Sequence, residues 1–345
     1  MAEYPGDFTR SEEVATTNVT RPHLVILGAG ASRAAFPQGD ANGRRLPVMD
    51  DFVEVLELGD LLRESSFDPA RNFEELYAEL HKSPDHAVLR EELERRIYSY
   101  FSEMQLPEQP TLYDRIVWSL RPKDIVATFN WDPFLYDAWT RCYLRIGKAV
   151  PQLAFLHGNV RSAVCIEDRR KGRTANSCSV CGKMLEPTRL LYPITEKNYE
   201  TDPFIAGEWS LVRWALKGAL VVTIFGYGAP ASDSAAIALM SEAWGEVDSR
   251  PMEEFEFIDI ASEDTVRQRW DRFVHSHHYQ STDRFDDSLL ATHPRRVCEA
   301  MFAQLYDARF VEGNRMVPRA QWADFVANYE PLLEREREAP RADSP

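Results

Sequence analysis

The sequence lacks any apolar run long enough to cross a bilayer, and the longest one spans only Ala219 to Gly226. A membrane-spanning helix needs about 20 consecutive apolar residues, so the sequence argues against a membrane protein. The stretch from Met1 to Val14 carries acidic side chains and has no apolar core, so we expect no signal peptide. These absences predict a soluble protein of the cytoplasm.

The sequence also lacks an excess of positive charge. Its 345 residues include 40 Lys and Arg against 55 Asp and Glu, a formal net charge of -15. A surface that acidic repels anionic lipid and the phosphate backbone of nucleic acid. We therefore expect no direct nucleic acid binding and no membrane partner. The basic run from Arg169 to Arg173 is expected to be a solvated loop, although it could contact an acidic partner.

Cysteine is scarce, with five residues, three of which cluster between Cys165 and Cys181. An odd, clustered set is typical of a reducing compartment with a metal site rather than of a disulfide framework. Cys178 and Cys181 have the spacing of half a zinc knuckle, and Cys165 with Asp168 would supply the other half. The alternative is a ribbon that has lost its metal. Zinc in this site would hold a loop and take no part in chemistry.

The sequence does contain a strand-to-helix turn of small residues. An apolar run typical of a buried strand, Leu24 to Leu27, leads directly into Gly28-Ala29-Gly30-Ala31-Ser32 and then a helical start at Arg33. In such a turn, backbone N–H groups point into a concavity at the positive end of the helix dipole, which suits a diphosphate. The third glycine of the dinucleotide fingerprint is missing, so a purely structural turn is the alternative.

Strand-type and helix-type segments alternate along the chain. Strands are expected at Leu24 to Leu27, Asp124 to Phe129, Leu153 to Leu156, Ala219 to Phe225 and, as the last, Phe255 to Ile260. This alternation predicts an α/β fold with a Rossmann-like, doubly wound and mostly parallel sheet. Apolar residues at helical spacing predict a first helix from Phe52 to Leu62, and further helical patterns follow it. We therefore expect a helical insertion over about 50–120 that covers the ligand site at the sheet.

The expected domain organisation follows from these patterns. We expect residues 1–21 to form a flexible N-terminal tail and residues 22–262 to form the main domain. Within that domain we expect a small Cys-containing, zinc-ribbon-like insertion over about 160–188. Residues 263–334 are expected to form a C-terminal helical extension. The stretch 335–345 is charged and contains proline, so we expect a disordered tail there.

Polar or glycine-rich residues follow the expected strands. They are Asn130-Trp131-Asp132, His157-Gly158, Gly226-Tyr227-Gly228 and Ala261-Ser262. In a doubly wound sheet, ligands bind outside the carboxyl ends of the strands. We therefore expect these residues to converge on one site.

Five motifs, in this order, resemble those of the sirtuin superfamily of NAD-consuming domains. They are GAGAS at 28–32, TFNWD at 128–132, LHG at 156–158, the Cys-x-x-Cys segment and FGYGAPASD at 225–233. The resemblance runs from about Leu24 to Ser262 and implies that 22–262 is a sirtuin-like NAD-binding domain, with NAD as the substrate.

One segment departs from the typical deacylase sirtuin. There the first glycine motif is followed by Gly-Ile-Pro-Asp-Phe-Arg, whereas this chain reads AAFPQGDANG at 34–43. Because that loop helps to order the nicotinamide pocket in the deacylases, the departure argues against protein deacylation. The chain looks more like the bacterial sirtuin-like domains of antiviral defence, in which the same pocket hydrolyses NAD and depletes the cofactor pool.

The candidate catalytic residues are Asn130, His157 and Asp132. His157 would accept a proton from a ribose hydroxyl or from water, since a near-neutral pKa suits that step, and the alternative is a core histidine bonded to a backbone carbonyl. Asn130 would orient the ribose and the attacking water through its amide, and Asp132 would stabilise the site or the developing cation. For this pair the alternative is an Asx-type helix cap.

The candidate NAD-binding residues lie in the turns. Ser32 and the amides of Ala29, Gly30 and Ala31 are expected to face the diphosphate. The glycines Gly28, Gly226 and Gly228, with Tyr227 between the last two, would let the backbone approach NAD closely. Asp233 resembles the family's acid after that turn, or else caps a helix. Asp259 would bond the adenosine ribose, or else has a surface or capping role.

Three functions are open. The first is an NAD glycohydrolase that releases nicotinamide and ADP-ribose as an effector of antiphage defence, controlled by a homo-oligomer or an activating protein partner because uncontrolled NAD hydrolysis is toxic. The second is an NAD-dependent protein deacylase or ADP-ribosyltransferase. The third is a non-catalytic module that senses NAD or ADP-ribose.

Overall fold

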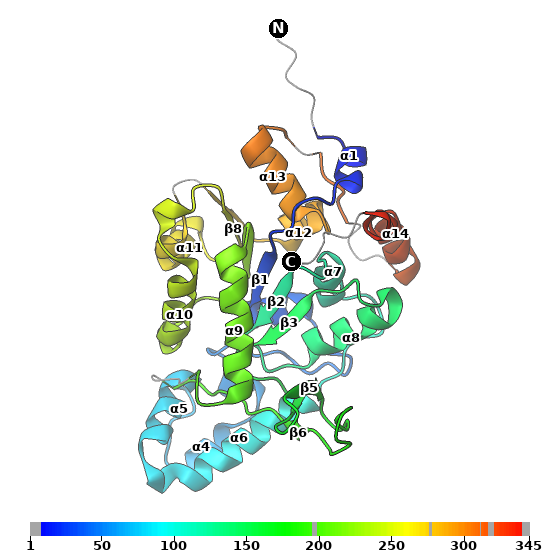
Figure 1. Ribbon diagram of the computed structural model, residues 1–345. Helices are drawn as coiled ribbons and strands as arrows, with labels where there is room; N and C mark the ends of the chain where they lie inside the picture. Colours follow the sequence, from blue (N-terminus) through cyan, green and yellow to red (C-terminus); the bar gives the residue numbers. More distant parts are fainter. Residues whose placement is uncertain (1–7, 195–198, 276–277, 311, 317–320, 340–345) are drawn as a thin grey trace.

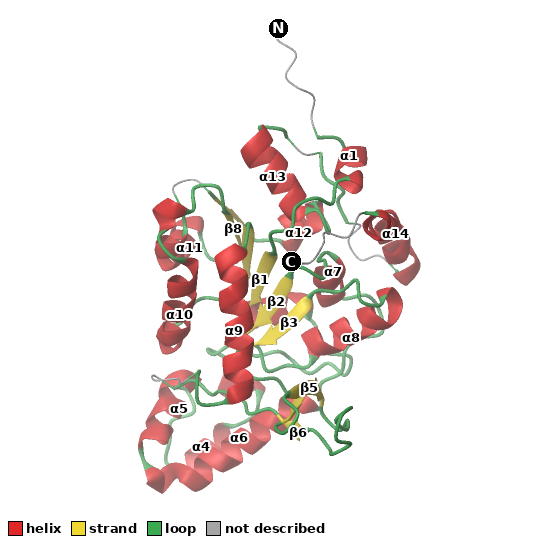
Figure 2. Ribbon diagram, in the orientation of Figure 1, coloured by secondary structure: helices red, strands yellow, loops and turns green. Residues whose placement is uncertain are grey.

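A six-stranded parallel sheet lies at the centre of the protein in the computed structural model, which describes residues 8–194, 199–275, 278–310, 312–316 and 321–339 (Figures 1 and 2). The strand order is β3-β2-β1-β7-β8-β9, and every neighbouring pair is parallel. The strands are β1 (His23–Leu27), β2 (Ile125–Thr128), β3 (Gln152–Phe155), β7 (Val221–Phe225), β8 (Glu254–Ile258) and β9 (Tyr279–Thr282). The predicted Rossmann-like α/β class is confirmed, with its switch point between β1 and β7.

Helices cover both faces of this sheet, because each central strand is apolar on both sides. Val25 and Leu27 of β1 belong to the larger hydrophobic core, and Leu24 and Ile26 to the second. Helices α9 (Pro203–Gly218), α10 (Ser234–Trp244) and α11 (Glu263–Trp270) supply the second core, with α9 across the front of the sheet in Figure 1. Helices α2 (Ala29–Ala35), α7 (Leu112–Trp118) and α8 (Phe134–Ile146) pack on the opposite face.

The predicted helical insertion is present between β1 and β2. It contains α3 (Phe52–Val55), α4 (Gly59–Glu64), α5 (Phe73–Lys82), α6 (Ala87–Ser102) and α7, and α4 to α6 lie at the lower end of the molecule in Figure 1. The sequence predicted one helix from Phe52 to Leu62, but the structure has two. Glu57 adopts a left-handed backbone with φ 54°, which ends α3 and redirects the chain.

The predicted Cys-containing insertion is a small antiparallel sheet of β4 (Ser162–Cys165), β5 (Arg170–Arg173) and β6 (Glu186–Pro187). Four residues of the basic run predicted to be a loop, Arg170–Arg173, therefore form strand β5, and Arg169 lies in the turn before it. Two of its cations pair with acids of the same chain: Lys171 with Glu208 at 2.8 Å, and Arg173 with Asp137 at 2.7 Å.

The region after Ser262 is not wholly helical. Tyr279–Thr282 forms β9, which pairs with β8 at the edge of the main sheet, so the prediction that Phe255 to Ile260 is the last strand was wrong. All four residues of β9 are only partly buried, and YQST carries no apolar run that would have revealed a strand. The remaining helices are α12 (Leu289–Thr292), α13 (Val297–Asp307) and α14 (Trp322–Glu338).

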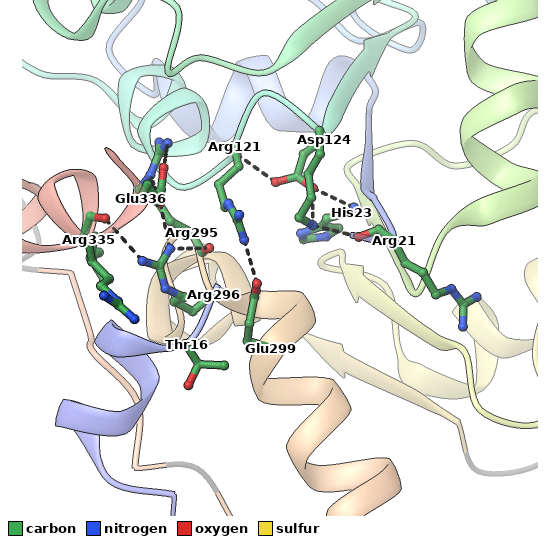
Figure 3. Close-up of polar contacts among 12 residues, drawn as sticks. Thr16, Arg21, His23, Arg121, Asp124, Arg295, Arg296, Glu299, Arg335 and Glu336 are labelled. Atoms are coloured by element: carbon green, nitrogen blue, oxygen red, sulfur yellow. Dashed lines mark hydrogen bonds and ion pairs between the residues drawn. The ribbon is translucent and has the colours of Figure 1, made fainter. Parts of the chain in front are cut away.

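Buried charged groups join these terminal helices beside the amino ends of the strands (Figure 3). Arg295 and Arg296, both almost fully buried, pair with Glu336 of α14 at 2.6 and 2.7 Å. Breaking such a buried pair by removing one partner typically costs about 3–5 kcal/mol. The network therefore ties α14 firmly to the rest of the domain.

Parts of both predicted tails are ordered. Residues 10–15 form α1, Arg10–Ala15, whose Glu13 is fully buried and accepts from Arg296 through its carbonyl oxygen at 3.2 Å. Helix α14 continues to Glu338, and residues 1–7 and 340–345 lie outside the described residues. Among the helices that are described, none combines the length and apolar character that crossing a membrane requires.

Candidate active site

The carboxyl ends of β1, β2, β3, β7 and β8 surround a cavity of about 750 Å³. Phe52 and Phe101 of the helical insertion line its other wall. Most of the predicted site residues line it: Gly28, Ala29, Gly30, Ser32, Asn130, Asp132, His157, Gly226, Tyr227, Gly228, Asp233 and Asp259. Residues from five strand ends thus share one cavity of the size that binds cofactors.

The two glycine turns at the switch point pack directly against each other. Gly226 has φ 59°, and a Cβ on it would lie 2.3 Å from the amide nitrogen of Ala31. A Cβ on Gly28 would lie 2.4 Å from the carbonyl oxygen of Gly226. These two glycines therefore permit a close approach between β1 and β7 turns, which is a structural requirement in its own right.

Two of the amides predicted to face a diphosphate are engaged inside the protein. The N–H of Gly30 donates to the carbonyl oxygen of Gly226 at 3.0 Å, and that of Ala31 to the carbonyl oxygen of Gly28 at 3.0 Å. The prediction is wrong for these two positions, because both N–H groups donate to backbone carbonyl oxygens of the two packed turns and not to a ligand. Ala31 does not line the cavity, whereas Ala29 does.

Asn130 lies at the centre of the site with its amide orientation fixed. Its Nδ2 donates to the carbonyl oxygen of Gly28 at 2.8 Å and to Oγ of Ser32 at 2.8 Å. A backbone carbonyl can only accept, so the nitrogen must face Gly28. The carboxamide oxygen has no hydrogen bond among the described residues, and Asn130 lines the cavity. That oxygen is thus an acceptor available to a ligand hydroxyl or a water.

Ser32 and Asp132 form a buried network behind this asparagine. Oγ of Ser32 donates to Oδ2 of Asp132 at 2.6 Å and lies 2.7 Å from the hydroxyl of Tyr113. Burial raises the pKa of Asp132 to about 6, and at neutral pH its carboxylate accepts this bond. The Ser32 side chain was predicted to face a diphosphate, but its hydroxyl is engaged in this network instead.

Asp132 also serves the Asx-type role that the sequence left open. Its Oδ1 accepts from the N–H of Phe134 at 3.1 Å, in the first turn of α8. The carboxylate thus links the start of α8 to Ser32.

His157 lies in an aromatic and acidic pocket, 6% exposed. Its Nε2 is 3.1 Å from the hydroxyl of Tyr199 and 3.7 Å from Oδ1 of Asp233. Oδ2 of Asp233 accepts from the hydroxyl of Tyr227 at 2.9 Å. Asp233 precedes α10 but its side chain makes no cap hydrogen bond, so the acid predicted to bind cofactor or cap a helix contacts the histidine pocket. A carboxylate beside an imidazole stabilises the protonated ring.

Another part of the cavity lining contains a glycine with free space beside it, Gly228, and a charged side chain, Arg269. A Cβ added at Gly228 would meet only Arg269, whose Nη1 would be 3.7 Å away. Arg269 comes from α11 and lines the cavity, and no carboxylate pairs with it among the described residues. Asp259 also lines the cavity, and its Oδ1 accepts from the N–H of Ala261 at 2.8 Å. This bond lies in the loop after β8 and caps no helix, because the N-cap of α11 is Ser262.

Three contributors escaped the sequence analysis: Tyr113, Tyr199 and Arg269. None of the three directly follows a predicted strand or belongs to one of the five sirtuin-like motifs, so the sequence carries no signal for them. Each reaches the cavity region from a helix or a loop packed over the strand ends, so only tertiary packing reveals it.

The predicted metal ligands form a compact cluster. The ligand atoms of Cys165, Asp168, Cys178 and Cys181 all lie within 4.8 Å of one another. Oδ2 of Asp168 is 3.3 Å from Sγ of Cys165 and 3.2 Å from Sγ of Cys178. Tetrahedral zinc with bonds of about 2.0–2.3 Å separates its ligand atoms by about 3.5–3.8 Å, so three thiolates and one carboxylate at these distances fit zinc.

Zinc content tests this cluster. We expect about one zinc ion per chain, released by a chelator, because all four ligands already converge. Asp168→Asn is expected to lose most of the metal, whereas Glu167→Gln, which changes the neighbouring acid outside the cluster, should retain it. Metal analysis of the purified variants measures this. Equal zinc in both variants would remove Asp168 from the ligand set.

Fold and site together define a Rossmann-like α/β protein with a cofactor-sized cavity at the switch point of its sheet. No family model and no curated protein matches the chain. Solved structures of Sir2 proteins do match. A Sir2 homologue in complex with NAD is 14% identical, with 88% of this chain and 96% of that one covered, at a TM-score of 0.36.

Two further Sir2 structures are similar to the same extent. A Sir2 homologue variant in complex with ADP-ribose is 12% identical, with 97% and 98% of the two chains covered, at a TM-score of 0.37. Sir2 bound to acetylated peptide is 12% identical, with 84% and 93% covered, at a TM-score of 0.37. These proteins bear the name of the superfamily that the sequence motifs resemble. At such TM-scores the likeness carries no argument for function.

Proposed function

We propose that this chain is an NAD glycohydrolase of sirtuin-like type, which cleaves the bond between nicotinamide and ribose. The observation that carries the proposal is one cavity, of about 750 Å³, that is lined by the oriented amide of Asn130, the pair His157 and Asp233, and the turn at Gly228. The resemblance of the five motifs to those of sirtuins supports NAD as the ligand. A role in antiphage defence by NAD depletion rests on the sequence resemblance alone.

The reaction needs few protein groups. Water adds its oxygen to the anomeric carbon of the ribose, the bond to nitrogen breaks, and nicotinamide leaves as a neutral base with the bonding electron pair. One proton of the water must be removed. Positive charge develops on the ribose as the bond breaks, so groups that hold the water and accept its proton favour the transition state.

Each of these tasks has a residue in the cavity. The carboxamide oxygen of Asn130 would accept a hydrogen bond from the water or from a ribose hydroxyl. His157 would take the proton, and Asp233, 3.7 Å away, would stabilise the imidazolium that forms. Asp132 would act through Ser32, because its carboxylate is engaged there and with the start of α8.

Product analysis distinguishes this function from the two alternatives. Purified protein is incubated with NAD, and nicotinamide and ADP-ribose are followed by chromatography. Equal release of both products without any peptide is the expected result. Release that depends on an acyl-lysine peptide would identify a deacylase, and stoichiometric NAD binding without release would identify a sensor. The homo-oligomer or activating partner and the cytoplasmic location stay predictions.

Arg269 is expected to bind the diphosphate of NAD. Its guanidinium lies by Gly228 without an acidic partner among the described residues, while Arg33, another cation of the lining, pairs with Asp51 at 2.9 Å. Arg269→Gln should raise KM for NAD about tenfold with kcat unchanged, since the charge binds substrate and transition state alike.

The control for Arg269→Gln is Arg267→Gln, a change of charge on the same helix outside the cavity lining. Steady-state kinetics of both variants, at one ionic strength, decide the point. An equal KM in the two variants would show that Arg269 does not contact the substrate.

A further inference from the structure

Tyr113 contacts the candidate site from the helical insertion. It belongs to α7, its side chain is fully buried, and its hydroxyl is 2.7 Å from Oγ of Ser32 and 3.4 Å from Nδ2 of Asn130. Burial raises the pKa of this phenol well above its usual value, so it keeps its proton. It is therefore available as a hydrogen-bond donor.

Hydrogen-bond accounting fixes the direction of every bond around Ser32. The hydroxyl has one proton, which goes to Asp132 at 2.6 Å, and two lone pairs. Nδ2 of Asn130 donates to one of them and the hydroxyl of Tyr113 must donate to the other. The one donor and both acceptor positions of the Ser32 hydroxyl are thus occupied. Its oxygen can accept from Nδ2 of Asn130 only when the hydroxyl proton points to Asp132.

The position of Tyr113 is itself well determined, because α7 is held at both ends. Thr111 and Asp114 form a capping box at the amino end, and Nε of Arg141 donates to Oδ1 of Asp114 at 2.9 Å. At the other end, Nη1 of Arg295 donates to the carbonyl oxygens of Trp118 and Leu120, at 3.0 and 2.7 Å. Such anchoring leaves the hydroxyl little freedom to leave Ser32.

We propose that Tyr113 is a positioning residue for Asn130: its hydroxyl holds Ser32 so that the carboxamide oxygen of Asn130 faces the cavity. The consequence for catalysis rests on the proposed function. The structural claim does not, since it concerns only the orientation of the amide.

Tyr113→Phe removes a single O–H group and keeps the ring. We expect kcat for nicotinamide release to fall about tenfold with KM for NAD unchanged, because the amide still meets the substrate but is held less firmly in the reacting geometry. The matched control is Tyr329→Phe, another fully buried tyrosine outside the cavity lining, whose hydroxyl lies 3.1 Å from Oγ of Ser119. That variant should keep both constants.

The amide of Asn130 can be followed without any turnover. With ¹⁵N-labelled asparagine, the side-chain amide signal is assigned by its loss in Asn130→Asp, and its hydrogen exchange with water is measured. Slow exchange is expected in the wild type and in Tyr329→Phe, and at least tenfold faster exchange in Tyr113→Phe. Ser32→Ala, which removes the same bond from the other side, should show the same acceleration.

The two readouts separate the two claims. Unchanged exchange in Tyr113→Phe and Ser32→Ala would overturn the positioning role, whatever the kinetics show. A wild type that releases no nicotinamide, combined with faster exchange in these variants, would overturn the proposed function and leave the positioning role intact. A rise in KM with kcat unchanged in Tyr113→Phe would overturn the catalytic consequence of the positioning role, because that pattern belongs to a group that binds substrate uniformly.

Discussion

Asn130→Ala is expected to lower nicotinamide release at least a hundredfold while leaving the protein folded. The carboxamide oxygen is an oriented acceptor with no partner among the described residues, and alanine removes it from the cavity. Loss of one preorganised polar group at a reacting centre typically costs about 10²- to 10³-fold in kcat. Chromatographic measurement of nicotinamide at saturating NAD gives this ratio.

The control for this variant is Asn176→Ala, which removes an exposed asparagine of the Cys-containing insertion, outside the cavity lining. It should keep the wild-type rate. Thermal unfolding of Asn130→Ala should occur within a few degrees of the wild type. A folded Asn130→Ala protein with the wild-type rate would show that this amide has no part in the chemistry.

His157→Gln is expected to lower kcat by about 10²- to 10⁴-fold, the usual contribution of a general base. Glutamine keeps a polar side chain beside Tyr199 and Asp233 but cannot take up a proton near neutral pH. Asp233→Asn should have a smaller effect, because that carboxylate acts on the imidazolium and not on the water. The rates are compared at saturating NAD.

His81→Gln is the control, since His81 is exposed on α5 and does not line the cavity. Its rate should equal that of the wild type. The proposed base would be wrong if His157→Gln and His81→Gln were equally active.

The central sheet could be predicted because its strands are apolar on both faces. Buried runs such as Leu24 to Leu27 and Val221 to Phe225 leave a strong pattern in the sequence. Strand β9 could not, because an edge strand of partly exposed polar residues is compatible with many local structures. The insertion begins with two helices, α3 and α4, because Glu57 between them adopts a left-handed backbone. The sequence carries no signal for that conformation at a glutamate.

The site shows the same division. Strand ends revealed Asn130 and His157, because the carboxyl ends of parallel strands meet at one edge. The hydrogen-bond and ion-pair partners of these side chains could not be predicted from strand ends. The bond between Ser32 and Tyr113 joins residues 81 positions apart, and the pairing of His157 with Asp233 depends on how α10 enters the fold. Such pairings follow from packing, which local patterns do not encode.

The central claim is that one dinucleotide occupies the cavity at the switch point, with its nicotinamide ribose between Asn130 and His157. A crystal structure of the Asn130→Ala variant soaked with NAD tests this most directly, because the variant is expected to bind NAD without consuming it. The account predicts the diphosphate beside Gly228 and Arg269 and the nicotinamide ribose facing His157. An empty cavity at saturating NAD, or NAD bound elsewhere on the protein, would contradict it.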